Sequence, residues 1–368
     1  MLGTENVNGE LDVLDLKFPD FPPQPERWAL SKPPATNGKS KSQQPKDNDE
    51  DDEMTDSQSK GSGSKIAIVS GLGFSGADGS HALELELLLE YLLGETLDPV
   101  AQQELAQISR LVIAGNSISL EERSAVGEED DGPAQQKKPQ QHKKYGYDSS
   151  SYNALPSQLL DDFLAALLPS VPVTLLPGAQ DPANVSYPQQ PIHSAMFPGS
   201  RPYAAVPGSA EAESKGGWFD TVTNPWEAEL DGWRVLGTGG QNVDDVFKYV
   251  DSDDRLGMME AMCRWRCCAP TAPDTLCKLG LTYLYYILLT YDARIGSYPF
   301  QDDDPFVMTT CPHLYFVGCQ PEFGTKVVHG PEGQSVRLIA VPSFLETKEI
   351  VLVDSETLEV SKVKIATI

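Results

Sequence analysis

A strand, helix, strand, helix, strand order in the first half of the chain constrains the fold more than any other feature. The run KIAIVS has the length and composition of a buried strand, and two later stretches repeat leucine at helical spacing. Crossover helices join parallel strands, so the pattern predicts an α/β unit with parallel strands. The predicted elements are strands at 65–70, 109–117 and 171–182 and helices at 80–94 and 156–171.

The first predicted strand runs into a glycine-rich turn, in which Gly71, Gly73 and Gly76 spell G-x-G-x-x-G. A dinucleotide-binding loop needs a helix that opens directly from the turn and an acidic residue about 20 residues further on. Here the polar residues ADGS separate the turn from the helix pattern, and the next strand ends at Gly115 and Asn116 without a carboxylate. The sequence therefore favours an ordinary strand-end turn over a dinucleotide site.

The second half of the chain predicts further strands joined by short turns, with antiparallel pairing among the last ones. We expect TGGQN, residues 238–242, to be a tight turn whose amides are hydrogen-bonded. The predicted strands lie at 232–242, 313–324, 335–344 and 349–360.

Small-residue turns follow several of the predicted strands in both halves. They read VSGLG, IAGNS, LPGAQDP, GTGGQN and FVGCQPEFG. In an open α/β sheet the turns that follow parallel strands gather at one edge, where sites are built. This layout resembles the calcineurin-like metallophosphoesterases, in which aspartate, histidine and asparagine side chains on such turns hold two metal ions.

The metal ligands that this resemblance requires are missing from the matching turns. The degenerate motif positions are Ser70, Gly71, Gly115, Asn116, Gly178, Asp181, Gln241, Asn242 and Gly318. Among them Asp181 alone carries a carboxylate, and one carboxylate with a few neutral amides is too little for a dimetal centre. We therefore expect no catalytic, metal-binding or cofactor-binding residues. A metal-dependent phosphoesterase with unusual ligands remains the alternative.

Four longer runs carry a closer resemblance. They are residues 176–198, 222–249, 269–276 and 298–328. These runs are similar to the B (small) subunits of eukaryotic DNA polymerases alpha, delta and epsilon, and match those of delta best. The resemblance implies an α+β protein: an inactivated phosphoesterase β-sandwich flanked by helices and preceded by an oligonucleotide/oligosaccharide-binding barrel. It also implies that the chain has no catalysis of its own.

The resemblance further implies a scaffold role in nuclear DNA replication and repair. The expected partners are the C-terminal metal-binding region of a polymerase catalytic subunit and the third subunit of that complex. DNA is expected to be contacted only indirectly through the complex, and no membrane is involved. The composition independently favours protein partners, because 28 Lys and Arg against 54 Asp and Glu give a formal charge of −26, which repels phosphate backbones.

The resemblance also divides the chain into parts. We expect residues 1–30 to be the C-terminal remnant of the barrel with the crossover that leaves it. Residues 31–64 are expected to be a disordered acidic and polar linker, and residues 65–368 the phosphoesterase-like domain. Within that domain, 121–151 and 199–217 are expected to be flexible loops, since polar stretches bury too little apolar area to offset the entropy of ordering.

One segment departs from the family pattern. Residues 277–297, CKLGLTYLYYILLTYDARIGS, interrupt a matching run. Their apolar core is shorter than the roughly 20 residues that a membrane-spanning helix needs. We expect this segment to be an artefact of the gene model, such as a translated intron, and a buried helix is the alternative. The late start of the match within the barrel is expected to have the same cause.

Overall fold

The computed structural model describes residues 2–7, 9, 11–15, 17–27, 64–76, 79–95, 99–119, 153–184, 186–204, 217–272, 296–297 and 303–365. Two mixed sheets form the body of the described chain, with strand orders β15-β14-β3-β4-β5-β7 and β12-β13-β11-β9-β8. The α+β class expected from the sequence is confirmed. The finer likeness to a calcineurin-like sandwich and to a barrel remnant stays a prediction.

The six-stranded sheet has a parallel centre, because β3, β4, β5 and β7 run in one direction. Its two remaining strands, β14 and β15, are antiparallel additions at one edge. The strands are β3 (Lys65–Val69), β4 (Ile108–Ala114), β5 (Val173–Leu176), β7 (Phe219–Thr221), β14 (Glu349–Asp354) and β15 (Val360–Lys364).

The five-stranded sheet has a parallel core of β9, β11 and β13, with an antiparallel strand on each side. The expected antiparallel pairing among the last strands occurs, but it is divided between the sheets: β13 pairs with β12, and β14 pairs with β15. The strands are β8 (Trp226–Leu230), β9 (Trp233–Thr238), β11 (Leu314–Gln320), β12 (Gly324–His329) and β13 (Ser335–Pro342).

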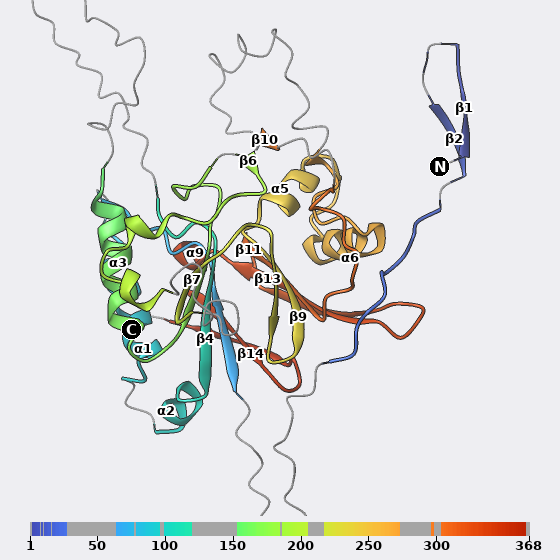
Figure 1. The fold of residues 1–368 in the computed structure, drawn as a ribbon. Coiled ribbons are helices and arrows are strands. Elements are labelled where there is room, and N and C mark those ends of the chain that lie inside the picture. Colours follow the sequence, from blue (N-terminus) through green and yellow to red (C-terminus); the bar gives the residue numbers. More distant parts are fainter. Residues whose placement is uncertain are drawn as a thin grey trace, which may run out of the picture.

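Helices cover the outer face of each sheet. On the six-stranded sheet lie α1 (Ala82–Leu92) and α3 (Leu155–Leu167), and α2 (Pro99–Leu105) precedes β4. On the five-stranded sheet lie α5 (Gln241–Phe247) and α6 (Arg255–Trp265). Figure 1 shows the resulting order of helix, sheet, sheet and helix across the molecule.

Strand alternation explains these layers, because successive side chains of a strand face opposite sides of its sheet. On β3, Ile66 and Ile68 join the core between the two sheets, whereas Ala67 and Val69 join the core beneath α1 and α3. On β11, Phe316 faces the other sheet. The buried strands are therefore apolar on both faces, which is why their sequences read as continuous hydrophobic runs.

Several short elements complete the described chain. They are β1 (Leu2–Glu5), β2 (Leu11–Asp15), β6 (Ser186–Tyr187), β10 (Gly296–Ser297), the 3-10 turns η2 (Ser194–Met196) and η3 (Arg201–Tyr203), and α9 (Phe344–Thr347). Among the described residues, no helix is both long and apolar enough to cross a bilayer.

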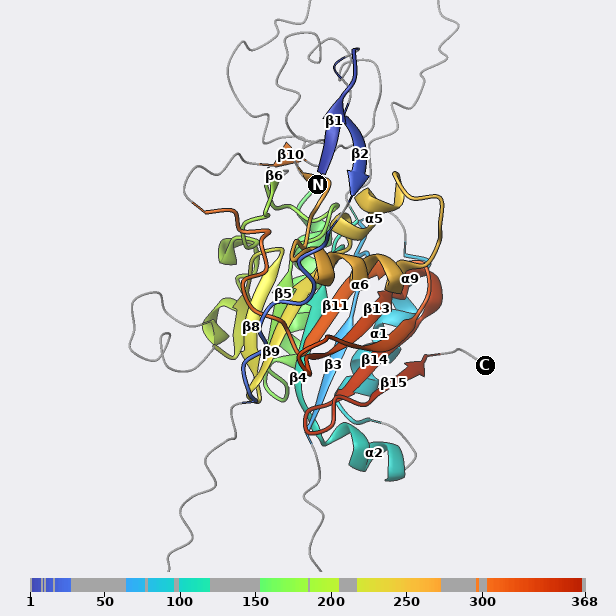
Figure 2. The same cartoon turned by 90° about the vertical axis from the view of Figure 1, so that its right-hand side faces the viewer.

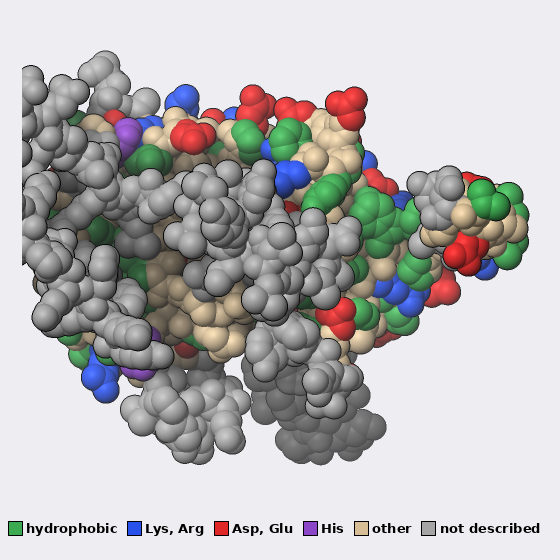
Figure 3. All heavy atoms as spheres, turned by 90° about the horizontal axis from the view of Figure 1, so that it is seen from above, with side chains coloured by type: hydrophobic (Ala, Val, Ile, Leu, Met, Phe, Trp, Pro, Cys, Tyr) green, Lys and Arg blue, Asp and Glu red, His purple; other side chains and the backbone are tan. Residues whose placement is uncertain are grey.

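The N-terminal hairpin of β1 and β2 projects away from the body (Figure 2). Seen from above, it carries hydrophobic side chains on its surface, and Leu2 and Leu14 are exposed (Figure 3). Residues 17–27 lead from the hairpin onto the five-stranded sheet. There Phe21 is buried. The Gln24 side-chain amide donates to the carbonyl of Ser335 at 2.8 Å and accepts from its backbone N–H at 2.9 Å.

The outcome for the predicted segments follows from these bounds. The first three strands and both helices are confirmed, with ends that differ by a few residues. The predicted strand at 232–242 is wrong at its end, because β9 stops at Thr238 and α5 begins at Gln241. Residues 31–63, 121–151 and 205–216 lie outside the described residues, as does 277–297 except for Gly296 and Ser297.

Candidate functional site

The carboxyl ends of the parallel strands from both sheets meet at one edge of the sandwich. The turns after β4, β5 and β9 and the end of β11 approach one another there through glycines. We call this cluster the glycine junction; it consists of Gly115, Gly178, Gly239, Gly240 and Gly318. The predicted gathering of small-residue turns is thus observed, but it forms between two sheets rather than along one.

The glycine junction is packed main chain against main chain. A methyl group on Gly115 would lie 2.9 Å from the Cα atom of Gly239 and 3.1 Å from that of Gly178. One on Gly318 would overlap the carbonyl oxygen of Ala114. These neighbours are backbone atoms that cannot rotate away, and protein interiors have few voids. The positions therefore leave no space for a ligand side chain.

Ser70 and Gly71 close the junction on the β3 side. The Ser70 hydroxyl is fully buried and accepts a hydrogen bond from the backbone N–H of Cys319. Gly71 has a φ of +63°, and a methyl group there would lie 2.5 Å from Oγ of Ser343. Burial raises the pKa of the Cys319 thiol to about 12, so that the thiolate needed for nucleophilic chemistry is not present at neutral pH.

A network of neutral amides fills the space between the β5 and β9 turns. The Asn224 side-chain amide donates to Oε1 of Gln241 at 2.9 Å and to Oε1 of Gln189 at 3.0 Å. Gln241 donates in turn to Gln189 at 2.8 Å, and Gln189 donates to the carbonyl of Gly178 at 3.0 Å. All three side chains are buried. Buried amides that satisfy one another fix a single arrangement of the turns.

Asn242 fixes the start of α5 to the five-stranded sheet. Its Oδ1 accepts from the Thr238 hydroxyl at 2.9 Å, and its Nδ2 donates to the Cys268 carbonyl at 2.8 Å and to the Tyr315 hydroxyl at 2.9 Å. The prediction that the amides of residues 238–242 are hydrogen-bonded is confirmed. The prediction of a tight turn there is wrong, because Gly240, with a φ of +107°, starts a helix.

Asp181 is a buried carboxylate that joins two turns. Its Oδ1 accepts from the backbone N–H of Ile118 at 2.9 Å, and its Oδ2 accepts from that of Gly178 at 2.7 Å. Burial raises the pKa of the carboxyl from 3.8 to about 6, although the backbone N–H groups act in the opposite direction. Asn116 has a similar role, since its Oδ1 accepts from the backbone N–H of Gln180 at 3.0 Å. Both side chains therefore bind main chain.

The side chains at this edge therefore hold the strand-end turns together by binding their backbone. Within the described part of the chain, no group of three or more His, Cys, Asp or Glu side chains is placed to hold a metal ion. At the junction the Asp181 carboxylate accepts from backbone N–H groups, and the amides of Gln189, Asn224 and Gln241 are neutral and hydrogen-bonded to one another. A dimetal phosphoesterase needs several anionic or imidazole ligands around a shared open position, and these residues do not fit that requirement.

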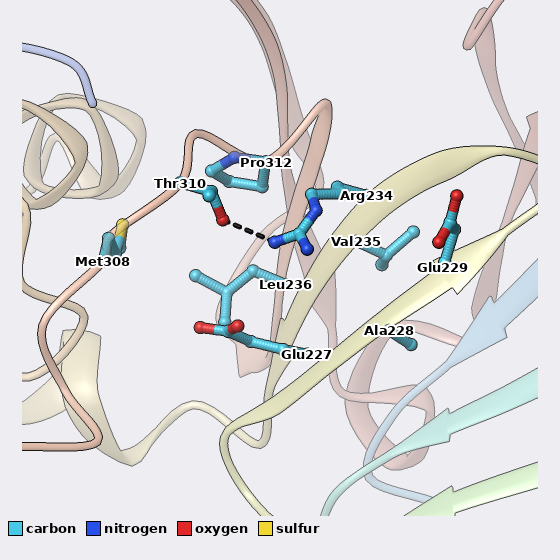
Figure 4. Close-up of a pocket in the computed structure, with 9 residues that line it drawn as sticks. All are labelled: Glu227, Ala228, Glu229, Arg234, Val235, Leu236, Met308, Thr310 and Pro312. Atoms are coloured by element: carbon cyan, nitrogen blue, oxygen red, sulfur yellow. Dashed lines mark hydrogen bonds between the residues drawn. The ribbon is translucent and has the colours of Figure 1, made fainter. Parts of the chain in front are cut away.

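A hollow of about 300 Å³ lies elsewhere, beside edge strand β8. Figure 4 shows Glu227 and Glu229 on β8 and Arg234 on β9, with the Arg234 guanidinium hydrogen-bonded to the Thr310 hydroxyl. None of the degenerate motif positions lines this hollow. It is therefore distinct from the site that the sequence indicated.

The structure brings the nine motif positions to the same edge and joins them through residues that sequence reasoning missed. Asn224 and Gln189 are the central members of the amide network, and Cys319 is the partner of Ser70. Each is a small or amide residue beside a proline or glycine, in the runs TNPW, YPQQP and VGCQ. That local pattern also suits any turn, so it does not single out these residues.

Comparison with known proteins gives one consistent family. Residues 66–325 match the family of DNA polymerase alpha/epsilon B subunits. A DNA polymerase delta small subunit from Oryza sativa subsp. japonica is 35% identical over 302 residues, or 82% of this chain, and one from Arabidopsis thaliana is 36% identical over 294 residues, or 80%. One from Saccharomyces cerevisiae is 32% identical over 324 residues, or 82% of this chain.

The same matches cover 59%, 56% and 56% of the lengths of the Oryza, Arabidopsis and Saccharomyces proteins. The chain thus spans little more than half the length of these curated relatives.

Proposed function

Because the chain belongs to the family of DNA polymerase alpha/epsilon B subunits, we propose that it is a non-catalytic accessory subunit of a DNA polymerase delta complex. In this role it bridges the C-terminal metal-binding region of the catalytic subunit and the third subunit. It acts in the nucleus in DNA replication and repair. DNA is reached through the complex.

One observation carries the proposal beyond family membership: the carboxyl edge that would hold metal ions is closed by the glycine junction and its amide network. An edge whose turns are locked by backbone contacts cannot bind a phosphodiester between them. It can hold the two sheets rigidly, and a rigid body is what a subunit with two partners has to provide. The charge of −26 also supports protein partners over direct DNA contact.

The experiment is co-expression of the full chain with a tagged C-terminal metal-binding region of a polymerase delta catalytic subunit. We expect the two to co-purify in equal amounts through size-exclusion chromatography. In parallel, the purified chain is incubated with manganese and bis-(p-nitrophenyl) phosphate, and no release of nitrophenol above buffer is expected. A chain that remains alone in the first experiment contradicts the scaffold role.

The phosphoesterase alternative makes a different prediction in the second experiment. It expects turnover that depends on manganese and is lost in the Asp181→Asn variant, since Asp181 is the carboxylate at the junction. An Asp162→Asn variant, which changes an exposed carboxylate on α3, controls for the loss of one negative charge. Turnover that is lost in the first variant and kept in the second would contradict the non-catalytic role.

A further inference from the structure

A second concave surface lies on the outer face of the six-stranded sheet. It is a groove of about 400 Å³ between α1 and α3, the two neighbouring helices of Figure 1. None of the glycines of the junction lines it. Its floor is apolar and contains Phe74 and Phe163, whose ring centroids are 5.5 Å apart. A hollow of this size is within the range of about 300–1,000 Å³ that is typical of binding sites.

The walls of the groove have the spacing of two helix faces. On α1 the lining residues are Ala82, Leu85, Glu86 and Leu89, and on α3 they are Leu159, Asp162 and Phe163. These positions repeat every three or four residues, so each helix presents one stripe to the groove. Paired helices with parallel stripes form the type of groove that accepts the apolar face of a third helix.

The rim of the groove is acidic. Glu86 on α1 and Asp162 on α3 are both exposed, and the lining residues that the structure describes include neither lysine nor arginine. Within the described residues, neither carboxylate forms an ion pair. The nearby ammonium of Lys348 lies 2.8 Å from Nδ1 of His81 and donates to the carbonyl of Leu345 at 2.8 Å. The two carboxylates are therefore available to cations of a partner.

Part of the apolar lining is also exposed. Leu159 on α3, which lines the groove, is 37% exposed. An acidic rim beside an exposed leucine is matched by a surface that combines large apolar side chains with Lys or Arg.

We propose that this groove docks an amphipathic helix of a partner protein, with large apolar side chains on one face and Lys or Arg on either side of that face. A second copy of this chain is a poor occupant, because its charge of −26 meets an acidic rim. The chain's own residues 121–151 include the basic run KKPQQHKK but contain no Leu, Ile, Phe or Met. They cannot supply large aliphatic side chains at helical spacing. Docking in this groove does not depend on the function proposed above.

The test uses a fluorescein-labelled synthetic helix with leucines at positions i, i+3, i+4 and i+7 and lysines beside them. A second probe has glutamate in place of each lysine. Anisotropy titrations with the full chain compare the two probes at 50 and 300 mM salt. We expect the lysine probe to bind at least about tenfold more tightly than the glutamate probe, with the difference reduced at high salt because the rim charges are exposed.

Variants of the rim test whether the probe binds in the groove. Glu86→Lys combined with Asp162→Lys is expected to lower the affinity for the lysine probe by about tenfold or more and to raise the affinity for the glutamate probe. Both residues are exposed, so the fold is retained, which circular dichroism checks. Glu356→Lys combined with Glu359→Lys, two exposed changes before β15 that do not line the groove, alters the charge by the same amount; it is the matched control and is expected to leave binding unchanged.

Three results would overturn the proposal. The first is equal binding of the two probes. The second is a loss of binding in the control variant as large as in the rim variant. The third is binding of the lysine probe only after residues 121–151 are replaced by a Gly-Ser linker, which would make this chain's own segment the occupant. Tighter binding of the lysine probe by the full chain, reversed in the rim variant, supports it.

Discussion

Replacing Asp181 by asparagine tests how the carboxyl edge is held together. In the folded chain this carboxylate is 5% exposed and lies between the N–H groups of Ile118 and Gly178. Burial disfavours its charge, the N–H groups favour it, and burial is the larger effect, since the pKa rises from 3.8 to about 6. At about 1.4 kcal/mol for each unit of pKa, the rise corresponds to about 3 kcal/mol between the two protonation states.

The sign of the pH dependence follows from linkage. Below pH 3.8 the carboxyl is protonated in both the folded and the unfolded chain. Between 3.8 and about 6 the unfolded chain releases its proton first, so the free energy of unfolding falls as pH rises. Above about pH 6 the carboxyl is charged in both states, and its contribution to the free energy of unfolding no longer changes with pH. Between pH 5 and pH 7 the expected fall is about 1.3 kcal/mol.

The assay is urea unfolding followed by tryptophan fluorescence at half-unit steps from pH 5 to pH 7.5. The range stops at pH 5 because the sequence pI is about 4.4 and solubility falls near it. Asparagine does not titrate, so the free energy of the wild type minus that of Asp181→Asn isolates the aspartate. Asp162→Asn, at an exposed position, reports the general effect of removing one negative charge from an acidic chain.

We expect the difference between wild type and Asp181→Asn to fall by about 1.3 kcal/mol from pH 5 to pH 7. A level difference over this pH range would mean that the N–H groups offset or outweigh burial, so that the pKa of Asp181 in the folded chain lies at or below 3.8. That result would refute the balance derived from the structure.

Three further predictions concern the junction and the sequence itself. Gly318→Ala should lower the free energy of unfolding by about 3 kcal/mol or more, because the new methyl group overlaps the Ala114 carbonyl. Gly79→Ala, with no atom within 4 Å of its added carbon, is the control. Equal urea midpoints for the two variants would contradict the packing argument. Asn242→Ala should cost about 2–4 kcal/mol in the same assay, because it leaves the Thr238 hydroxyl and the Cys268 carbonyl without their amide partner, and a loss below about 1 kcal/mol would oppose that reading. Full-length transcript sequencing should lack codons for residues 277–297 in most reads, and their regular presence would refute the artefact.

The strands and helices of the six-stranded sheet could be predicted because their signals are local. Residues 66–69 form a continuous apolar run, and the leucines of α3 repeat at helical spacing. α6 was missed although Met258, Met259 and Met262 are buried on one side of it. Polar residues and Gly257 weaken the apolar pattern of this helix. Its burial comes from packing on the five-stranded sheet, which a local window does not contain.

The site was predictable in its location but not in its contacts. Turns after parallel strands have to gather at one edge, so Gly115, Gly178 and Asp181 could be placed together in advance. The partners of Asp181 could not be foreseen, because Ile118 is 63 residues away in sequence and contributes only a backbone N–H. A buried polar side chain can find its partner anywhere along the folded chain, and the sequence alone does not say where.

The glycine junction shows how strand-end turns can be joined without metal ligands. A metal centre holds strand ends apart, since carboxylate and imidazole side chains must reach a shared ion from several turns. Where Gly115, Gly239 and Gly318 stand, the turns approach until backbone atoms touch, and buried amides replace charged ligands as the links between them. These contacts stabilise the relative position of the two sheets. For a chain whose proposed role is to hold partners in fixed geometry, the residues most sensitive to substitution should therefore be the uncharged ones at this edge.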